Sequence, residues 1–304
     1  MRQTNALKDV WRTWRRQFKA RLPYVRKREH RVLQKKYADL IEAVDGLATP
    51  AAHARVSAVQ APSACLLGEV CFFVSFASQP DLKPHVVTHV TKLLDAGFAV
   101  VLTVNTDLPS HEICIPKNLA QRLSGVLVRE NTGFDFGAWA HTYALCESHG
   151  IDASKWTRLL LVNDSIVPSP NPVHFARMLE RVRASPAALV GLTESLMPQR
   201  HVQSYFLVLN GVALRHAFVQ ASLHGMLNFP TKSQVIDVYE TRWTGLLQAQ
   251  GLRCEALFPS LSTDPLSSDD TSLRWAELLE FGFPYLKTRV LDLLPTAQRE
   301  RLGF

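Results

Sequence analysis

The sequence lacks any uncharged hydrophobic run long enough to cross a membrane. A membrane-spanning helix needs roughly eighteen or more apolar residues, and no stretch of this chain approaches that length. The first residues lead into a charged segment without the apolar core of a secretory signal, so secretion is not expected. Cysteine is also scarce: the five cysteines are scattered, odd in number and never spaced Cys-x-x-Cys. A disulfide framework and a zinc site are therefore not expected, and a cytoplasmic protein fits the composition.

Positive charge is abundant only at the beginning of the chain. The whole chain has a net charge of +7, but residues 1–36 hold thirteen Lys or Arg and two acidic residues, a net of +11. The remainder therefore has a net charge of −4. When a high isoelectric point comes from one segment, it indicates what that segment binds and says little about the chemistry of the rest of the chain. Because the acidic remainder has no basic stripe interleaved with aromatic residues, no nucleic-acid partner is expected.

Residues 1–46 are predicted to form a basic helical arm. Trp11, Trp14 and Phe18 fall on one helical stripe that is flanked by arginines and a lysine. Aromatic residues beside cations suit the headgroup layer of an anionic membrane, so residues 1–36 are predicted to bind the membrane surface. The alternatives are that the arm packs on the main domain or that it contacts nucleic acid.

A single α/β domain is predicted for residues 65–304, after a linker at 47–64. Short apolar strands alternate with amphipathic helices, which predicts a mostly parallel sheet with helices on both faces. The chain is expected to end in a helical tail from about residue 262. The predicted strands are 70–76, 98–104, 125–129, 158–162, 187–193 and 203–209, and the predicted helices include 84–96, 212–222 and 232–249. Ligands of such sheets bind at the carboxyl ends of the strands, so polar residues just after strands are the candidates.

An acidic cluster, Asn163-Asp164-Ser165, directly follows the predicted strand 158–162. A carboxylate at the open end of a strand can hold a divalent cation, Mg²⁺ or Mn²⁺, which in turn neutralises a diphosphate leaving group. Asp164 is therefore the predicted metal ligand. The alternative is a helix or turn cap, because Asn, Asp and Ser are also the commonest capping residues.

A glycine-containing segment follows the predicted strand 125–129. Gly133 and Gly137 would let the backbone approach a bound group closely, and Asp135 between them can accept hydrogen bonds from a ribose or a base. Together with Asn131, these residues are predicted to bind a nucleotide-sugar. A tight turn with a structural Asp is the competing interpretation.

A third acid, Glu194, follows the strand 187–193 at the same edge of the sheet. It is the candidate general base, although it could instead bind acceptor hydroxyls. Asp269 and Asp270 are the rival base, with helix capping as the favoured interpretation of that pair.

Six segments carry a family resemblance: residues 71–76, 130–139, 159–165, 191–195, 203–210 and 275–287. These segments, which include Glu130-Asn-Thr-Gly-Phe-Asp135 and Asn163-Asp164-Ser165, resemble the rhamnan synthesis protein F family. The resemblance runs in order from about residue 70 to 290 and excludes the basic arm. It implies a GT-A-like fold, the fold of many nucleotide-sugar transferases.

The resemblance also implies roles for single residues. Asn163-Asp164-Ser165 stands where many such transferases carry an Asp-x-Asp motif, with Asn163 replacing the first Asp. Asn163 is thereby placed at the nucleotide-sugar, and one carboxylate is left for Mg²⁺. Ser75 and Asn105 match positions that would line the nucleotide pocket.

The expected function is a glycosyltransferase of surface polysaccharide or O-antigen assembly. It would transfer a sugar, L-rhamnose or a related deoxysugar, from a nucleotide-sugar with deoxythymidine diphosphate as the expected carrier. The acceptor would be a growing lipid-linked glycan, which places the protein at the inner face of the cell membrane. The alternative is a non-catalytic scaffold that keeps the fold and binds a polysaccharide synthase partner.

Overall fold

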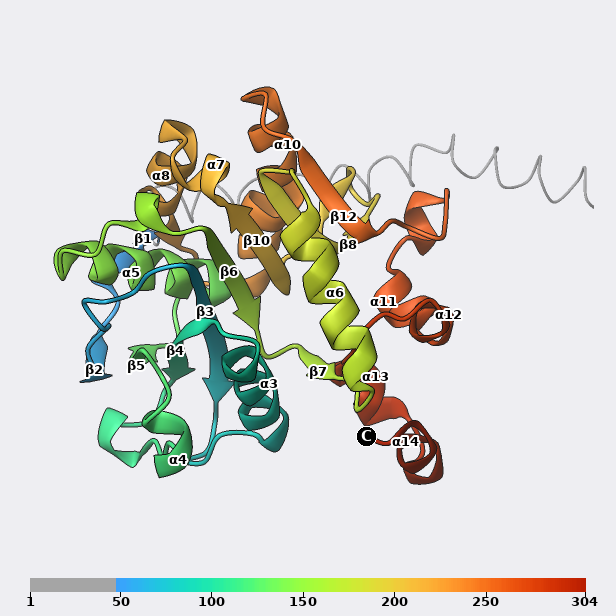
Figure 1. Cartoon of the computed structure of the whole chain (residues 1–304), viewed down its shortest axis with the longest axis horizontal. Helices are drawn as coiled ribbons and strands as arrows, with labels where there is room; N and C mark the ends of the chain where they lie inside the picture. The colour runs from blue at the N-terminus through green and yellow to red at the C-terminus, as the bar shows by residue number, and fades with distance from the viewer. Residues whose placement is uncertain (1–47) are drawn as a thin grey trace, which may run out of the picture. The chain divides into compact units, whose positions relative to one another are not determined.

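The computed structural model of the chain describes residues 48–304, and the predicted arm at 1–46 lies outside this range. Residues Thr49–Phe304 form one compact unit built around a central sheet of nine strands (Figure 1). Within the described residues, no helix combines the length and the apolar character needed to cross a bilayer.

The central sheet is mixed and mostly parallel. Its strand order is β12-β8-β10-β6-β3-β4-β5-β2, with β9 paired to β8. The parallel strands are β3 (Glu69–Ala77), β4 (Ala99–Thr106), β5 (Gly125–Glu130), β6 (Arg158–Asn163), β8 (Leu189–Ser195) and β12 (Cys254–Phe258). The antiparallel strands are β2 (Val56–Gln60), β9 (His201–Val202) and β10 (Phe206–Asn210).

Both faces of the sheet are covered, which explains the near-continuous apolar runs of the central strands. On one face, Cys71 and Phe73 of β3 belong to a core cluster with apolar residues of α3 (Pro84–Asp95) and α6 (Pro172–Ala184). On the other face, Thr103 of β4 bonds to Thr142 of α5 (Phe134–Ser148), with 2.8 Å between the hydroxyl oxygens. Figure 1 shows α3 and α6 in front of the sheet and α5 behind it. The α/β prediction, with a mostly parallel sheet and helices on both faces, is confirmed.

The remaining elements lie around this frame. The short strand pairs are β1 (Thr49–Pro50) with β11 (Leu227–Asn228) and β7 (Ile166–Pro168) with β13 (Tyr285–Lys287). The other helices are α4 (Lys117–Ala120), α7 (Gly211–Leu214), α8 (Ala217–His224), α9 (Lys232–Val235), α10 (Thr241–Ala249), α11 (Asp270–Leu273), α12 (Trp275–Glu280), α13 (Thr288–Leu293) and α14 (Thr296–Leu302). A π-helical segment, Ile236–Glu240, joins α9 to α10.

Two boundary predictions need correction. The predicted linker at 47–64 contains β1 and β2, and β2 extends the central sheet by pairing with β5. These residues therefore belong to the folded unit. The C-terminal segment from about 262 does contain short helices, the 3₁₀-helix Pro265–Ser267 and α11 to α14, but it is not purely helical, because its strand β13 pairs with β7 and Tyr285 is buried in the core.

The sheet reverses its strand order between β3 and β6. From β3 the chain adds β4 and then β5 on one side, and it returns to add β6 on the other side. Such a reversal opens a crevice outside the carboxyl ends of the two central strands, which is the usual ligand position in doubly wound sheets.

Candidate functional site

The carboxyl ends of β3 and β6 bring together several of the predicted site residues. Strand β6 ends at Asn163, and Asp164 follows it directly. Successive side chains of a strand point to opposite faces, so these neighbours diverge. Asn163 bonds to Asp135 of α5, whereas Asp164 bonds to Ser75 of β3. The site therefore has two halves, one around Asn163 and Asp135 and one around Asp164 and Ser75, because neighbouring side chains at the end of β6 point to opposite faces of the sheet.

Asp164 is the centre of the half nearer α3. Its Oδ2 atom accepts hydrogen bonds from Ser75 Oγ at 3.0 Å, from Phe76 N at 3.2 Å and from Lys83 Nζ at 2.8 Å. The ring of His85 contacts the backbone oxygen of Asp164, with Nε2 at 3.0 Å. Burial of His85 lowers its pKa, which favours the neutral form of its ring. Sequence reasoning found Ser75 and Asp164 but missed Lys83 and His85, which stand at the start of α3.

The donor set around Asp164 does not fit the predicted divalent cation. Mg²⁺ is held by oxygen ligands, usually with one or two carboxylates, and Asp164 is the one carboxylate of the Asn163-Asp164-Ser165 segment. The Asp164 carboxylate already forms an ion pair with Lys83. A divalent cation on that carboxylate would have to displace the ammonium or lie close to it, and two like charges repel.

Asn163 is equally committed to the protein. Its Nδ2 donates to Asp135 Oδ2 at 2.7 Å, and its Oδ1 accepts from Ser165 N at 3.1 Å and from Ser165 Oγ at 2.6 Å. Asn163 stands where an Asp-x-Asp motif has its first Asp. Its side-chain oxygen is used by these two hydrogen bonds, which stabilise the turn after β6. Part of the capping alternative holds here, because Asn163 bonds the backbone two residues on.

Asp135 lies on the first turn of α5 and is half-buried. Burial raises its pKa, the charge of Lys232 lowers it and the charge of Glu240 raises it again. The charge of Glu240, at the end of the π-helical segment, therefore acts on Asp135. Glu240 accepts a hydrogen bond from Ser204 Oγ at 2.6 Å. The sequence analysis did not identify Glu240. The structure places it at the end of a π-helical segment, a feature that occurs often at functional sites.

Arg129 organises the loop between β5 and α5. This buried guanidinium donates to Glu130 O, Thr132 O, Ala51 O, Asn228 Oδ1 and His141 Nδ1, at distances of 2.6 to 3.4 Å. Five acceptors match the five N–H groups of arginine. Burial lowers the pKa of Arg129 to about 10, which leaves it charged at pH 7. Because the hydrogen-bonding capacity of Arg129 is filled by the protein, its role is structural.

The two glycines, Gly133 just before α5 and Gly137 within its first turns, leave room for a protein side chain. A Cβ at Gly133 would lie 2.2 Å from Asn228 Oδ1, and a Cβ at Gly137 would lie 2.5 Å from the same atom. Gly133 also has a φ of +68°, which favours glycine. The prediction that they make room for a nucleotide-sugar is therefore corrected: the space is filled by Asn228, which accepts a hydrogen bond from Arg129 at 2.7 Å.

The remaining predicted pocket residues lie near this loop. Asn105, at the end of β4, donates from Nδ2 to Phe134 O at 3.1 Å. Its buried Oδ1 has no hydrogen-bond partner among the described residues. Asn131 is half-buried in the bend between β5 and α5. Asn105 thus bonds to the start of the helix that carries Asp135.

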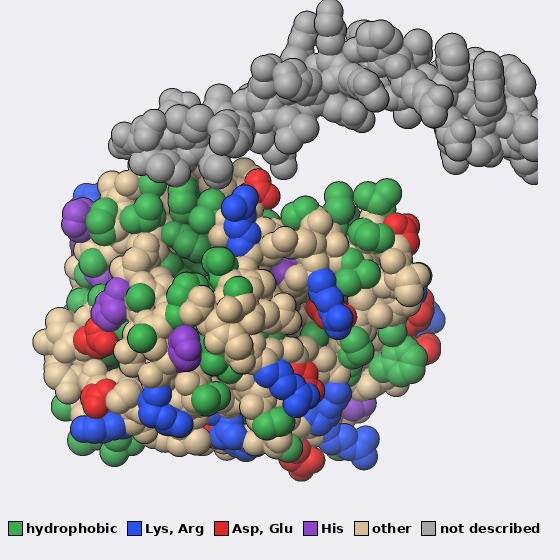
Figure 2. Space-filling view, turned by 90° about the horizontal axis from the view of Figure 1, so that it is seen from above, with side chains coloured by type: hydrophobic (Ala, Val, Ile, Leu, Met, Phe, Trp, Pro, Cys, Tyr) green, Lys and Arg blue, Asp and Glu red, His purple; other side chains and the backbone are tan. Residues whose placement is uncertain are grey.

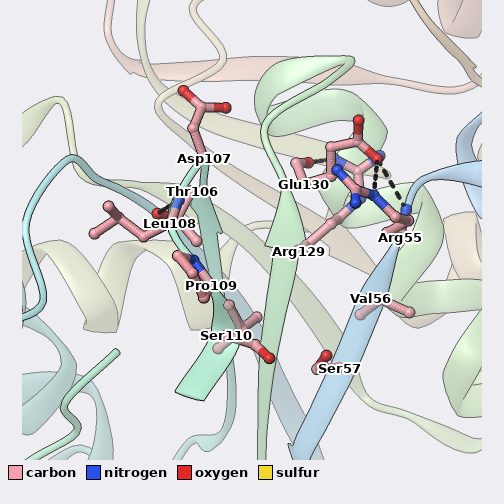
Figure 3. A pocket seen from close by; sticks show the side chains of 11 residues that line it. Arg55, Val56, Ser57, Thr106, Asp107, Leu108, Pro109, Ser110, Arg129 and Glu130 are labelled. Carbon is pink, nitrogen blue, oxygen red and sulfur yellow. Dashed lines mark hydrogen bonds and ion pairs between the residues drawn. The ribbon is translucent and has the colours of Figure 1, made fainter. Parts of the chain in front are cut away.

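A cavity of about 540 Å³ adjoins these residues at the carboxyl ends of β4 and β5 (Figure 3). The segment 106–110 forms one wall and β2 the other, while Arg129 and Glu130 come from β5 between them. Arg55 donates to Glu130 Oε2 through its backbone N at 3.2 Å and its Nε at 3.3 Å. Asn105 and Asn131 are sequence neighbours of this lining, which puts the cavity beside the candidate nucleotide-binding residues.

Glu194 is brought to the same edge of the sheet but is tied to other groups. Its carboxylate accepts two hydrogen bonds from Arg200, at 2.8 and 3.2 Å, and one from Ser260 N at 3.2 Å. A bidentate arginine and a backbone amide give the buried Glu194 a structural partner on each side. Its predicted role as a base therefore competes with a clear structural role.

The rival pair also has partners. Asp269 contacts Lys287 Nζ at 3.3 Å, Thr271 Oγ1 at 2.7 Å and the guanidinium of Arg289. Although burial acts to raise it, these partners lower the pKa of Asp269 to about 2, which makes it a weak base. Asp270 is buried and accepts from Leu261 N at 2.7 Å. Asp269 occupies the N-cap position of α11 and Asp270 lies in its first turn, as the capping interpretation expects, but the Asp269 side chain makes no cap hydrogen bond to the helix backbone.

Charge on the described unit is mixed. Acidic side chains are interspersed among the basic ones on the face drawn in Figure 2. Some charges of the unit are paired, as in the ion pairs of Glu69 with Arg158 at 2.8 Å and with Arg183 at 2.6 Å.

Comparison with known proteins places the chain in a family. A sequence model of the family described as rhamnan synthesis protein F matches residues 88–300. The chain is also 25% identical, over 226 residues, to virulence protein VirA of Vibrio anguillarum, and the match spans 64% of this chain and 70% of the relative. A second VirA sequence from that species gives the same values. Because the family match covers well over half of its residues, the chain belongs to the rhamnan synthesis protein F family.

Proposed function

We propose that this protein is a glycosyltransferase of surface polysaccharide synthesis. Its family links it to rhamnan synthesis, and making a rhamnan requires the transfer of rhamnose units. The expected donor is a nucleotide-sugar with deoxythymidine diphosphate as carrier, and the expected acceptor is a growing lipid-linked glycan. The name of the VirA relatives, a virulence protein, suits a polysaccharide displayed at the cell surface.

The observation that carries the proposal is the convergence of polar residues at the switch point of the sheet. Ser75, Asp164 and Asn163 come from β3 and from the end of β6, and they meet Asp135 from α5 there. This is where a doubly wound sheet binds a nucleotide. A mostly parallel sheet with one antiparallel strand inserted between β6 and β8 is compatible with the proposed GT-A-like fold.

In the proposed reaction, a hydroxyl oxygen of the acceptor attacks the anomeric carbon of the donor sugar. The bond between that carbon and the diphosphate oxygen breaks, the nucleoside diphosphate leaves, and the hydroxyl proton passes to a base. Asp135 would accept hydrogen bonds from the nucleoside, with Asn105 and Asn131 beside it. Asp164 and its side-chain partners Ser75 and Lys83 would lie at the diphosphate.

Two acids are candidates for the base. Glu194, predicted from the sequence, holds Arg200 and Ser260 N. Glu240 is less engaged: one oxygen accepts from Ser204, and the other lies 3.9 Å from His201 Nε2. Because a base needs a free oxygen to take the proton, Glu240 is the better candidate. Glu240→Gln should then reduce kcat by about 100-fold or more at unchanged donor affinity, whereas Glu194→Gln should mainly reduce stability.

A thermal-shift screen of nucleotide-sugars tests the proposal. A ligand held at a hundred times its Kd stabilises the fold by about 2.7 kcal/mol, which shifts the melting temperature of a 250-residue unit by about 5–10 °C. We expect deoxythymidine diphosphate sugars to give the largest shift, and Asp135→Ala to remove it. Donor binding without turnover on a lipid-linked acceptor would favour the non-catalytic scaffold. No shift with any nucleotide-sugar would contradict the proposal.

Residues 1–36 would hold the enzyme at an anionic membrane, where lipid-linked acceptors lie. Their net charge of +11 and the stripe of Trp11, Trp14 and Phe18 support this proposal. Each cation near the surface contributes about 1 kcal/mol of attraction to anionic lipid. The inner face of the cell membrane is the corresponding location.

A further inference from the structure

We propose that the ammonium group of Lys83, positioned by Asp164, binds the diphosphate of the donor in place of a divalent cation. This inference rests on the proposed function, because it concerns the diphosphate of the same nucleotide-sugar. Donor binding would then be independent of Mg²⁺ and Mn²⁺.

The first support is the way in which Asp164 is held. Ser75 Oγ at 3.0 Å and Phe76 N at 3.2 Å both donate to Asp164 Oδ2, the same oxygen that accepts from Lys83 Nζ at 2.8 Å. Ser75 is buried, and Phe76 N belongs to the backbone of a central strand. The carboxylate is therefore a fixed point of the sheet, and it fixes the ammonium in turn. A preorganised cation loses less side-chain entropy when it binds an anion.

The second support is that Lys83 remains open to a ligand. Its side chain is 44% exposed, whereas that of Asp164 is 17% exposed. An ammonium group has three N–H donors, and the bond to Asp164 uses one of them. The others can donate to phosphate oxygens, as lysine does in many phosphate sites. The backbone of Lys83 is also anchored, because its carbonyl accepts from Val86 N at 2.9 Å at the start of α3.

The third support is the position of the ammonium. Asp164 directly follows β6, and Ser75 lies near the carboxyl end of β3. Lys83 Nζ therefore lies at the edge of the sheet where the strand order reverses. A divalent cation here would share the Asp164 carboxylate with Lys83, whose ammonium lies 2.8 Å from Oδ2, and Asn163 Oδ1 is used by Ser165. The ammonium group of Lys83 thus lies where the resemblance to an Asp-x-Asp motif predicted a metal ion.

The test is isothermal titration of the full chain with deoxythymidine, uridine and guanosine diphosphates, in EDTA and in Mg²⁺. We expect the best ligand to bind with a Kd that differs by less than about 3-fold between the two buffers. Lys83→Met should raise that Kd by about 10- to 100-fold, the cost of losing one charge-assisted hydrogen bond, and Lys83→Arg should recover most of the affinity. Lys117→Met, which removes an exposed lysine of α4, is the matched control and should bind as the wild type does.

Three results would contradict the inference, and they separate it from the proposed function. Binding that EDTA abolishes and Mg²⁺ restores would overturn the inference while the proposed function stands. A Lys83→Met protein that melts as the wild type does and binds with a Kd within 3-fold would do the same. No binding of any nucleoside diphosphate in either buffer would overturn the proposed function and the inference together. If Lys83→Met melts earlier, Lys83→Gln gives the same comparison with a polar side chain.

Discussion

Replacement of Arg129 by lysine should destabilise the fold strongly although it conserves the charge. The guanidinium is buried and donates to five acceptors, from Glu130, Thr132, Ala51, Asn228 and His141. An ammonium has at most three N–H groups, so at least two of these buried or part-buried acceptors lose their donor. Each buried group left without a partner costs about 1–3 kcal/mol, which gives a loss of about 2–6 kcal/mol.

The assay is thermal unfolding of the full chain, followed by circular dichroism. For a unit of about 250 residues, 1 kcal/mol corresponds to about 2–4 °C, so a loss of 4 kcal/mol should lower the melting temperature by about 8–16 °C. Arg122→Lys is the matched control, because Arg122 pairs with Asp95 at 2.6 Å on the surface with both side chains exposed. Such exposed pairs contribute about 0–1 kcal/mol. If Arg129→Lys shifts the melting temperature no more than Arg122→Lys does, the structural role assigned to Arg129 is wrong.

Asp135→Asn should weaken nucleotide binding. It should leave the free energy of unfolding at pH 7 unchanged or higher, because burial raises the pKa of Asp135 and its ionised form therefore opposes folding. Any gain should disappear as the pH falls below the ordinary Asp pKa of about 3.9, and a wild type more stable than the variant at pH 7 would refute this sign. Gly137→Ala should cost more than about 2 kcal/mol in chemical denaturation, because its Cβ would lie 2.5 Å from Asn228 Oδ1. The control Gly245→Ala, which has open space in α10, should instead stabilise by about 0.5–1 kcal/mol, and equal effects of the two would contradict the close packing at Gly137. Deletion of residues 1–46 should leave a folded unit that no longer sediments with anionic vesicles, and Trp11→Ser with Trp14→Ser should weaken vesicle binding even at low salt. Undiminished sedimentation of the truncated protein would show that the arm is not the anchor.

Local sequence patterns were sufficient for the central elements. The predicted strand 70–76 corresponds to β3 (Glu69–Ala77), and the predicted helix 84–96 corresponds to α3 (Pro84–Asp95). These elements carry their own signals, since the strand is an apolar run and the helix has a 3.6-residue apolar period that begins at a proline. The short strand β2 was missed because its exposed, polar-containing sequence resembles a loop, and only its pairing with β5 makes it a strand.

The position of the site could be predicted, but its partners could not. Asp135, Asn163 and Asp164 were identified because each follows a strand. The contact of Lys83 with Asp164 joins residues 81 positions apart, and the contact of Arg129 with Asn228 joins residues 99 positions apart. No local pattern encodes such pairs. For this reason Asp164 suggested a metal ligand and Gly137 a ligand contact, whereas the structure pairs Asp164 with lysine and fills the space beside Gly137 with Asn228.

The most direct test of the proposed glycosyltransferase is release of the nucleoside diphosphate from nucleotide-sugars, measured with full-length protein and a lipid-linked glycan acceptor. We predict release that requires the acceptor, and we predict that Asp164→Asn reduces the rate at least about 100-fold, as expected when a group that organises the diphosphate site is lost. The same variant should melt within a few degrees of the wild type, because the Lys83 side of the lost ion pair is partly exposed and the new amide oxygen can still accept from Ser75 Oγ and Phe76 N. A wild type that releases no nucleoside diphosphate from any donor, or an Asp164→Asn protein equally active per folded molecule, would contradict the assignment.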